Sequence, residues 1–295
     1  MYEFGGEHFH KTRMMSETTG FKAKTTPGPI DPRRSGIVQA YEMGQDFDQY
    51  KDALITPVIH ENDSLVLLPP QFSFLEPLTK APWWLHLVTW IPFVAWQWFG
   101  KMSCPCSFSL VCIFAVSFAM VWPLLEYVMH RFLFHMPVAW AKGNPWINVI
   151  RFLMHTVHHA HPRDRMRLIT PLPMSLAIAA IVFPIPLMLL RNMDDVRACV
   201  CGLIMGFVVY DYVHYFLHFG KPDTLPEPLR GWSRVLQKAH VNHHYAPRGM
   251  TQSFGVSHTV WDEWFGTFVT PQHISGNGVE KDAPKNTENK MDKVD

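Results

Sequence analysis

Four stretches of mostly apolar residues constrain the fold of this chain more than any other feature of its sequence. Each holds roughly 16 to 18 residues, close to the shortest helix that can cross the hydrocarbon core of a bilayer. Tryptophans lie near their ends, where amphipathic rings prefer the membrane interface, and this disfavours the alternative of buried helices in a soluble protein. The sequence therefore predicts an all-α integral membrane protein with four transmembrane helices, at about residues 83–99, 108–125, 174–190 and 198–213.

The positions of lysine and arginine predict how these helices are oriented. The loop between the first two spans carries Lys101, and the loop between the last two carries Arg191 and Arg197, offset by Asp194 and Asp195. The other basic residues lie in the N-terminal, central and C-terminal segments. Because basic segments tend to stay in the cytosol, we expect a multi-pass protein whose termini and central segment are cytosolic.

The polarity of the chain ends predicts one folded domain between two disordered segments. Residues 1–45 are polar and rich in Gly, Thr and Pro, and the tail 273–295 is charged. Such compositions bury too little apolar surface to fold. We therefore expect residues 46–272 to form a single domain, in which a helical cytosolic cap covers the four spans.

Ten histidines fall into four short sets whose spacing is typical of metal ligands. The pattern H-x-x-H-H occurs twice in segments predicted to be helical, and it places imidazoles at i, i+3 and i+4 on one helical face. The two histidines of HYFLH also share a face. Those of HRFLFH are about 140° apart around a helix, so both rings reach one point only at a helix end, which Pro137 predicts. The ten are His130 and His135, then His155, His158 and His159, then His214 and His218, then His240, His243 and His244.

The number of these histidines points to two metal ions. Imidazole binds Zn, Fe, Cu and Ni, whereas one structural zinc needs four donors and usually recruits cysteine. A centre with many histidines suits the activation of O₂, because neutral nitrogen donors hold iron while open positions admit oxygen. An isolated histidine is more often a polar core residue, so we interpret His86, His161 and His258 as structural.

Two carboxylates lie one helical turn from the histidines. Glu126 precedes His130 by four residues and Asp211 precedes His214 by three, so each shares a face with its histidine. We expect both carboxylates to orient imidazole N–H groups. The alternative for Glu126 is an interfacial cap or an ion pair with Arg131.

Helix length predicts the depth of the site. At 1.5 Å per residue, His214 lies about 24 Å along the last span from Ala198, at the cytosolic edge of the hydrocarbon. The metal ions are therefore expected at the depth of the lipid headgroups. The aromatic segment SFGVSHTVWDEWFGTF is expected to pack beneath the site or to lie on the bilayer surface.

Net charge and cysteine placement bear on partners and on redox state. The formal net charge of +1 argues against a nucleic-acid partner, which would require a strongly basic face. The pairs Cys104/Cys106 and Cys199/Cys201 lie near the two short loops on the predicted non-cytosolic side. A disulfide between the two hairpins is therefore one hypothesis, and small residues at a helix end are the other.

Five segments together resemble the fatty acid 2-hydroxylases of sphingolipid synthesis, within the wider fatty acid hydroxylase and sterol desaturase superfamily. They are EYVMHRFLFH, HTVHHAHPRDRMRL, YDYVHYFLHFG, HVNHHY and FGVSHTVWDEWFGT, and the resemblance covers roughly residues 45–272. It implies O₂-dependent hydroxylation at C2 of the acyl chain of ceramide or dihydroceramide, or of its fatty acid precursor, at the endoplasmic reticulum membrane.

The resemblance also implies cofactors and partners. All ten motif histidines match the family's metal ligands, which hold two iron ions in the active form and can hold zinc in purified protein. Electrons would come from cytochrome b5 and its reductase. Some relatives carry a fused cytochrome b5 domain with an HPGG motif, which this sequence lacks, so a separate cytochrome b5 is expected. Asp164, Arg167 and Tyr210 match family positions without an assigned role.

Two other functions remain as alternatives. A sterol-type oxidase or desaturase of the same superfamily would share the metal ligands but shape its pocket for rings. A non-catalytic membrane metal-binding or transport protein would place its ligands within the spans, whereas these histidines gather at one edge. C2 of an acyl chain is adjacent to the carbonyl and lies near headgroup level, which favours the 2-hydroxylase. We expect the substrate to enter near Met174 and Leu176.

Overall fold

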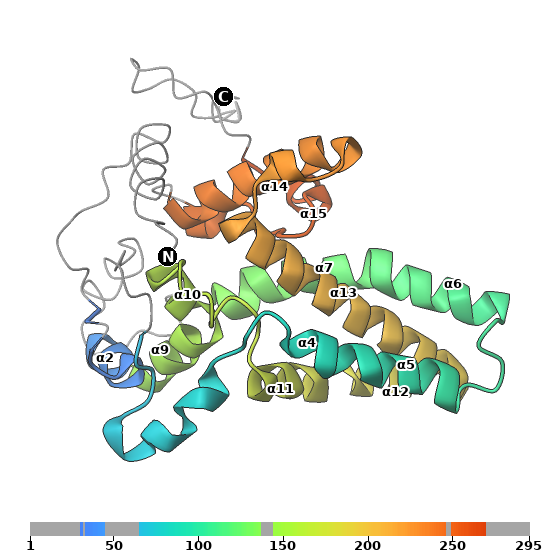
Figure 1. The fold of residues 1–295 in the computed structure, drawn as a ribbon, viewed down its shortest axis with the longest axis horizontal. Coiled ribbons are helices and arrows are strands. Elements are labelled where there is room, and N and C mark those ends of the chain that lie inside the picture. The colour runs from blue at the N-terminus through green and yellow to red at the C-terminus, as the bar shows by residue number, and fades with distance from the viewer. Residues whose placement is uncertain (1–29, 32, 45–64, 137–143, 246–248, 270–295) are drawn as a thin grey trace, which may run out of the picture. The chain divides into compact units, whose positions relative to one another are not determined.

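The computed structural model describes residues 30–31, 33–44, 65–136, 144–245 and 249–269. Every regular element within these residues is a helix, as Figure 1 shows, and the prediction of an all-α protein is confirmed for them. Pro137 and the tail 273–295 lie outside the described residues.

Three helices are long and apolar enough to cross a membrane. The first runs over Phe108–Phe134 and is continuous through α6 (Phe108–Val116), η2 (Ser117–Val121), α7 (Trp122–Val128) and η3 (Met129–Phe134). The second, over Leu172–Leu189, consists of α11 (Leu172–Val182) and α12 (Pro184–Leu189). The third is α13 (Met193–Phe219). At 1.5 Å per residue, a 27-residue helix such as the first or third is about 40 Å long and extends past the roughly 30 Å hydrocarbon core.

The expected span at 83–99 is not confirmed, because this segment forms two shorter helices. They are α4 (Leu85–Val88) and α5 (Trp90–Lys101), separated at Thr89. Pro92 explains the break, since it lacks the N–H that would bond to Val88 and its ring crowds that carbonyl. The two helices together are about 24 Å long, shorter than the hydrocarbon core.

Helix α13 is the centre of the helical core. It packs against α5, α6 and α7, and Figure 1 shows it between α5 and α6. Gly202 and Gly206 allow the close approach: a Cβ at Gly202 would lie 2.5 Å from the Phe114 carbonyl oxygen, and one at Gly206 would clash with the Trp122 side chain. The long apolar helices therefore pack through small residues, as is usual in membranes.

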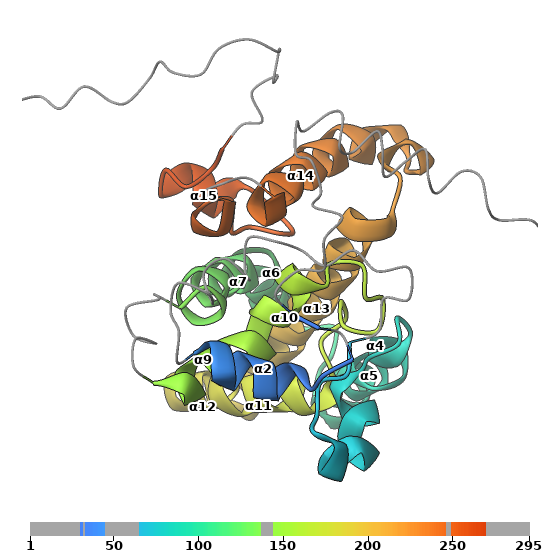
Figure 2. The same ribbon diagram turned by 90° about the vertical axis from the view of Figure 1, so that its left-hand side faces the viewer.

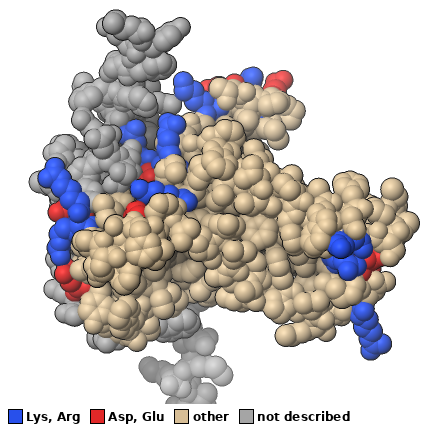
Figure 3. All heavy atoms as spheres, turned by 60° about the horizontal axis from the view of Figure 1, so that its bottom comes forward, with Lys and Arg blue, Asp and Glu red and all other residues tan. Residues whose placement is uncertain are grey.

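The distribution of charge agrees with a membrane protein. In Figure 3, Lys, Arg, Asp and Glu gather towards the two ends of the visible face, and the band between them carries none. Large apolar side chains, including Leu176, Ile181 and Met188, are exposed along these helices. An uncharged, apolar band of this kind is what a lipid-facing surface requires.

Shorter helices precede, connect and follow the long helices along the chain. They are α2 (Gly36–Met43), η1 (Pro70–Thr79), α9 (Pro145–Arg151), η4 (Phe152–Thr156), α10 (Val157–Ala160), η5 (Pro222–Thr224), α14 (Glu227–Tyr245), η6 (Gly249–Thr251) and α15 (Val260–Trp264). Helix α2 packs beside α9, as Figure 2 shows.

The expectation of disorder throughout residues 1–45 is wrong for Gly36–Met43. Ser35 caps this helix by accepting a hydrogen bond from the Val38 N–H, and Ala40 and Met43 are buried against Phe152 and its neighbours. Residues 1–45 are polar on average, but α2 within them has a short apolar face that packs on α9 and η4.

All five cysteines are free, and Cys104 and Cys106 are exposed. The structure therefore contains no disulfide between the two hairpins, and the alternative of small residues near helix ends holds.

Candidate metal centre

The ten motif histidines converge in two groups of five. Within each group, one ring nitrogen from every histidine lies within 4.8 Å of all the others. Group A contains His130, His135, His155, His159 and His243. Group B contains His158, His214, His218, His240 and His244.

Each H-x-x-H-H motif divides its histidines between the two groups. The i and i+4 histidines of the first motif, His155 and His159, belong to group A, and its i+3 histidine, His158, belongs to group B. The second motif does the reverse, so that only His243 joins group A. Each group thus combines an i, i+4 pair from one motif, a single histidine from the other, and a pair from one long helix. Although the three histidines of each motif share a helical face, their rings are therefore directed to two different groups.

A π-helical turn brings the two histidines of HRFLFH together. His130 lies in η3, and the His135 N–H donates to the His130 carbonyl 3.0 Å away, an i+5 bond. The wider π turn moves residues five apart closer in angle than an α-helix does. The helix also ends at Phe134, so the predicted helix end and the π turn together bring the Nε2 atoms within 3.2 Å.

The spacing of the ring nitrogens fits metal coordination. Neighbouring Nε2 atoms are 2.9 to 3.2 Å apart in group A and 2.8 to 3.1 Å apart in group B. Two nitrogens about 2.1 Å from one ion and at right angles to each other would be roughly 3.0 Å apart. Five such donors leave one position of an octahedron open.

The hydrogen bonds of two rings in group A suit a metal ion. Nδ1 of His130 lies within hydrogen-bond distance of the Phe254 carbonyl, and Nδ1 of His243 lies 2.8 Å from the Gln252 carbonyl. A carbonyl only accepts, so each Nδ1 carries the proton. In the neutral form of either ring, Nε2 then presents the lone pair that a metal ligand needs.

Burial keeps the imidazoles in their metal-binding form. Desolvation lowers the pKa of His155, His158, His159 and His244 well below the ordinary value of 6.5, and the neighbouring imidazoles lower it further. These rings are therefore neutral at pH 7. A neutral ring offers the lone pair that a metal ion needs.

Asp211 does not orient a histidine of either group, contrary to expectation. Its carboxylate lies 2.7 Å from Nε2 of His86 and accepts from the Thr170 N–H at 2.8 Å and the Thr170 hydroxyl at 3.0 Å. The carboxylate and His86 are both buried. This contact joins α4 to α13 and to the segment before α11. It confirms a structural role for His86 and gives one to Asp211.

Glu126 acts on the site through a loop, rather than on His130 directly. It accepts hydrogen bonds from the N–H groups of Val256 and Ser257, at 2.7 and 2.8 Å, and from the Ser257 hydroxyl. The proposed partner Arg131 donates to the Tyr127 hydroxyl instead. His258 donates from Nε2 to the Pro123 carbonyl oxygen, 3.1 Å away, which agrees with a structural role.

Asp262 is a buried carboxylate that the sequence analysis did not single out. It accepts from the N–H groups of Phe254 and Gly255 at 2.8 and 2.6 Å and from the Thr267 hydroxyl at 2.7 Å. The segment WDEWFGT contains it, but nothing in that pattern distinguishes Asp262 from its exposed neighbour Glu263. The aromatic segment lies beside α7, while Trp264 is 77% exposed.

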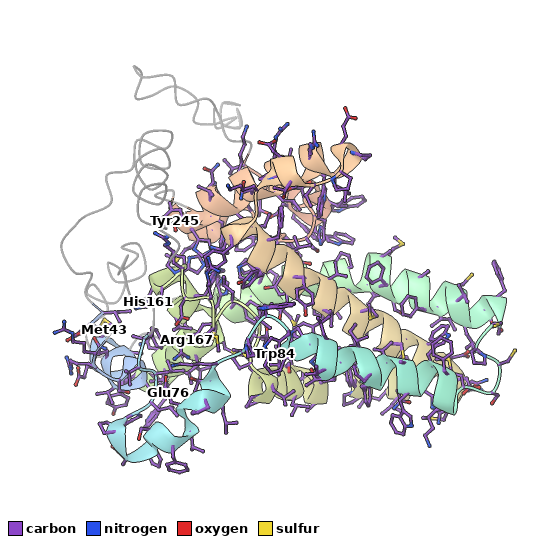
Figure 4. All side chains as sticks on the ribbon, viewed as in Figure 1. Met43, Glu76, Trp84, His161, Arg167 and Tyr245 are labelled. Atoms are coloured by element: carbon purple, nitrogen blue, oxygen red, sulfur yellow. The ribbon has the colours of Figure 1, made fainter. Side chains whose placement is uncertain are left out.

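Arg167 and Asp164 link the segment after the first motif to η1. Arg167 donates to Glu76 at 2.7 Å, and both residues are labelled in Figure 4. Arg167 also lies 3.2 Å from Asp164. Arg167 also donates to the carbonyls of Leu65 and Thr79. These contacts give Arg167 and Asp164 a structural role at the edge of the site.

Two small, mostly apolar cavities lie between the histidines and the core of the long helices. One is lined by Phe134 and Tyr210, whose rings stack on His155 and His214. The other, larger cavity lies among α5, α11 and α13. Both are lined by Trp122, Ile178 and Phe207. Neither is lined by Met174 or Leu176, where entry was expected; the neighbouring Ser175 and Ile178 face the larger cavity.

Comparison with known proteins identifies the relatives of this chain. It is 30% identical to the dihydroceramide fatty acyl 2-hydroxylase FAH1 of Arabidopsis thaliana, over 82% of this chain and 94% of that protein. It is 32% identical to the ceramide very long chain fatty acid hydroxylase SCS7 of Saccharomyces cerevisiae, over 82% of this chain and 59% of that protein. The chain is 29% identical to the human fatty acid 2-hydroxylase, over 82% of this chain and 65% of that protein.

A solved structure and a family model support the same relationship. The structure of full-length scs7p, in which only the hydroxylase domain is visible, aligns with a TM-score of 0.71 at 31% identity, covering 88% of this chain and 89% of that one. The family model described as "Fatty acid hydroxylase" matches residues 115–267, which contain all ten histidines. The chain belongs to the fatty acid hydroxylase family.

Proposed function

We propose that this protein is a two-metal fatty acyl 2-hydroxylase of sphingolipid synthesis, acting on the acyl chain of ceramide or dihydroceramide, or on its fatty acid precursor. The observation that carries the proposal is the convergence of ten histidines, eight of them buried, in two groups beside an apolar cavity. The relatives are named as 2-hydroxylases of such acyl chains.

Each group of five histidines would hold one metal ion, iron in the active enzyme and zinc as a substitute. The two ions would supply the activation of O₂ that inserts one oxygen atom into a C–H bond. The overall reaction consumes O₂, two electrons and two protons and yields the 2-hydroxyacyl group and water. Neutral imidazoles suit iron, and the open coordination positions described above suit oxygen.

The cavities would bind the acyl chain and set the position of hydroxylation. Phe134 and Tyr210 form a wall of the smaller cavity next to the histidines, and the larger cavity continues between the long helices. An acyl chain that lies in the larger cavity would place its carboxyl end, and therefore C2, beside Phe134 and Tyr210. These rings also exclude water from the reacting carbon.

The membrane setting suggests the location and the electron donor. The three long apolar helices favour a multi-pass protein of the endoplasmic reticulum membrane. With a fourth crossing by α4 and α5, the positions of the basic residues would place both termini and the histidines on the cytosolic side. Electrons would then come from cytochrome b5 and its reductase on that side. An oxygen-dependent hydroxylase needs such a donor because its histidines and apolar cavity supply no electrons.

The alternatives fit less well. A sterol-type oxidase would need a cavity shaped for fused rings, whereas the relatives named above act on fatty acyl chains. A non-catalytic metal-binding protein would not need the apolar cavity beside the histidines.

Expression in a yeast strain that lacks its own sphingolipid 2-hydroxylase tests the proposal. We expect 2-hydroxylated ceramides, measured by mass spectrometry, with the intact chain and none with His159→Ala. Because His8 lies outside the stretch that the family model matches, His8→Gln serves as the matched control and should retain product. Absence of product from the intact chain, with the protein present and cytochrome b5 co-expressed, would contradict the proposal.

A further inference from the structure

One loop, Gln252–Ser257, contacts histidines of group A. The carbonyl oxygens of Gln252 and Phe254 accept from Nδ1 of His243 and His130. Within the two groups, Nδ1 is buried without a hydrogen-bond partner among the described residues in His159 of group A and in His240 and His244 of group B. Two rings of group A are therefore oriented by a backbone carbonyl, a contact that the described residues give to no ring of group B.

Two buried carboxylates fix the backbone of this loop. Glu126 accepts from the N–H groups of Val256 and Ser257, and Asp262 accepts from those of Phe254 and Gly255. Glu126 is 2% exposed and Asp262 is 1% exposed. The two carboxylates thus hold four consecutive N–H groups. The Phe254 carbonyl lies among them, the Gln252 carbonyl lies two residues earlier, and both accept from histidines of group A.

The local backbone conformation indicates that the carboxylates impose the shape of the loop. Ser253 has a φ of 52°, in the left-handed region that a serine enters only at a cost in energy. At Gly255, a Cβ would clash with the His258 carbonyl and lie 2.9 Å from Asp262 Oδ2, so only glycine allows the carboxylate to approach the N–H this closely. A loop without such anchors would relax away from this geometry.

We propose that Glu126 and Asp262 are positioning residues for the metal ion of group A. They hold the loop, and the loop carbonyls fix His130 and His243 as the tautomer whose Nε2 lone pair faces the ion. A hydrogen bond from the far ring nitrogen also raises the basicity of the ligand. Group A therefore binds its ion more tightly than group B. This inference rests on the two-metal site of the proposed function.

The test measures the affinities of the two ions separately in the full chain, purified in detergent. Zn²⁺ is removed with a graded series of chelators, and bound zinc per chain is measured by mass spectrometry. The wild-type protein should lose its ions in two steps. Asp262→Asn, which keeps the volume of the side chain but removes its charge, should weaken the tighter step by about 10- to 100-fold and leave the other unchanged.

The chain offers a matched control and a second variant. Glu263→Gln changes the exposed carboxylate next to Asp262 and should bind both ions as the wild type does. Glu126→Gln removes the carboxylate at the other end of the loop and should have the same effect as Asp262→Asn. If one of the two variants does not fold, the other still tests the inference.

Three outcomes would overturn the inference. Unchanged affinities in both variants would show that the carboxylates do not position the ligands. Equal weakening of both steps, with a lowered unfolding temperature of the metal-free chain, would show a general structural role. A wild-type chain that binds fewer than two ions would overturn the two-metal site itself. The number of ions bound by the wild type therefore tests the proposed function before any variant is compared.

Discussion

His158 and His159 are neighbours in the chain, yet their rings belong to different groups. The same holds for His243 and His244. Adjacent residues on a helix point about 100° apart, so a doublet of histidines can contribute to two ions on either side of the helix. The H-x-x-H-H pattern thus joins the two groups, and the distance between the groups is fixed by the helix backbone.

At the same scale, Asp211 is expected to stabilise the fold without binding metal. Asp211→Leu removes the acceptor of His86 and of two Thr170 donors, all close to the buried carboxylate. Leaving buried donors unpaired costs about 1–3 kcal/mol for each group. We expect a lower unfolding temperature, measured in detergent, with both ions still bound at saturating metal. Asp195→Asn, at a partly exposed carboxylate, is the control, and loss of metal in Asp211→Leu would contradict this assignment.

At the scale of elements, the long helices form because their sequences are apolar over enough residues to cross a membrane. The contacts between them depend on small residues such as Gly202 and Gly206. The length and composition of the spans at 108–125, 174–190 and 198–213 could be predicted, because they depend on local sequence alone. The break at Thr89 follows from Pro92, a local signal within the expected span. The π turn at His130 could not be predicted, because it depends on what η3 packs against.

Gly206 and Gly231 are expected to respond oppositely to alanine. Gly206→Ala places a Cβ against the Trp122 side chain and overpacks the contact of α13 with α7, at a cost of about 1–3 kcal/mol. Gly231, within α14, has open space around its Cβ position, so Gly231→Ala should stabilise the helix by about 0.5–1 kcal/mol. Unfolding temperatures of the two variants measure both effects, and the same sign for both would contradict the packing described here.

The contact between η1 and Arg167 predicts a dependence of stability on pH. Burial raises the pKa of Glu76. The Leu67 and Leu68 N–H groups and the Arg167 guanidinium together lower it by more than burial raises it, so the pKa lies below the ordinary 4.5. The stabilisation is therefore complete above that value and is lost as the pH falls through the lowered pKa.

Arg167→Met tests this dependence. Without the guanidinium the pKa of Glu76 rises, so its contribution should be lost at a higher pH than in the wild type. Unfolding temperatures recorded between pH 3 and 7, with Arg165→Met as the control, would show the shift. Identical pH profiles of wild type and Arg167→Met would rule it out.

At the scale of the whole molecule, contacts between distant segments build the site. The sequence could predict which ten histidines gather, because each set has helical ligand spacing. It could not predict the division between groups A and B, nor the loop that orients His130, since Phe254 and Glu126 lie more than a hundred residues from their partners in the chain. The same reason explains why Asp211 was assigned to the nearby His214 when it binds His86.

The number of membrane crossings is also a property of the whole molecule. If α4 and α5 together cross the bilayer, the exposed Cys104 faces the lumen. A variant that retains only Cys104 should then react with a membrane-impermeant maleimide in microsomes only after permeabilisation. A variant without cysteines is the control. Labelling of intact microsomes would show that α4 and α5 do not cross.

The measurement that tests the central claim most directly is the amount of metal bound per chain. The account predicts two ions in the iron-loaded wild-type protein, and one ion in each of two double variants, His155→Ala/His159→Ala in group A and His240→Ala/His244→Ala in group B. Neither double variant should form 2-hydroxylated ceramide. A single ion in the wild type, or loss of both ions in either variant, would contradict two separate groups of five histidines.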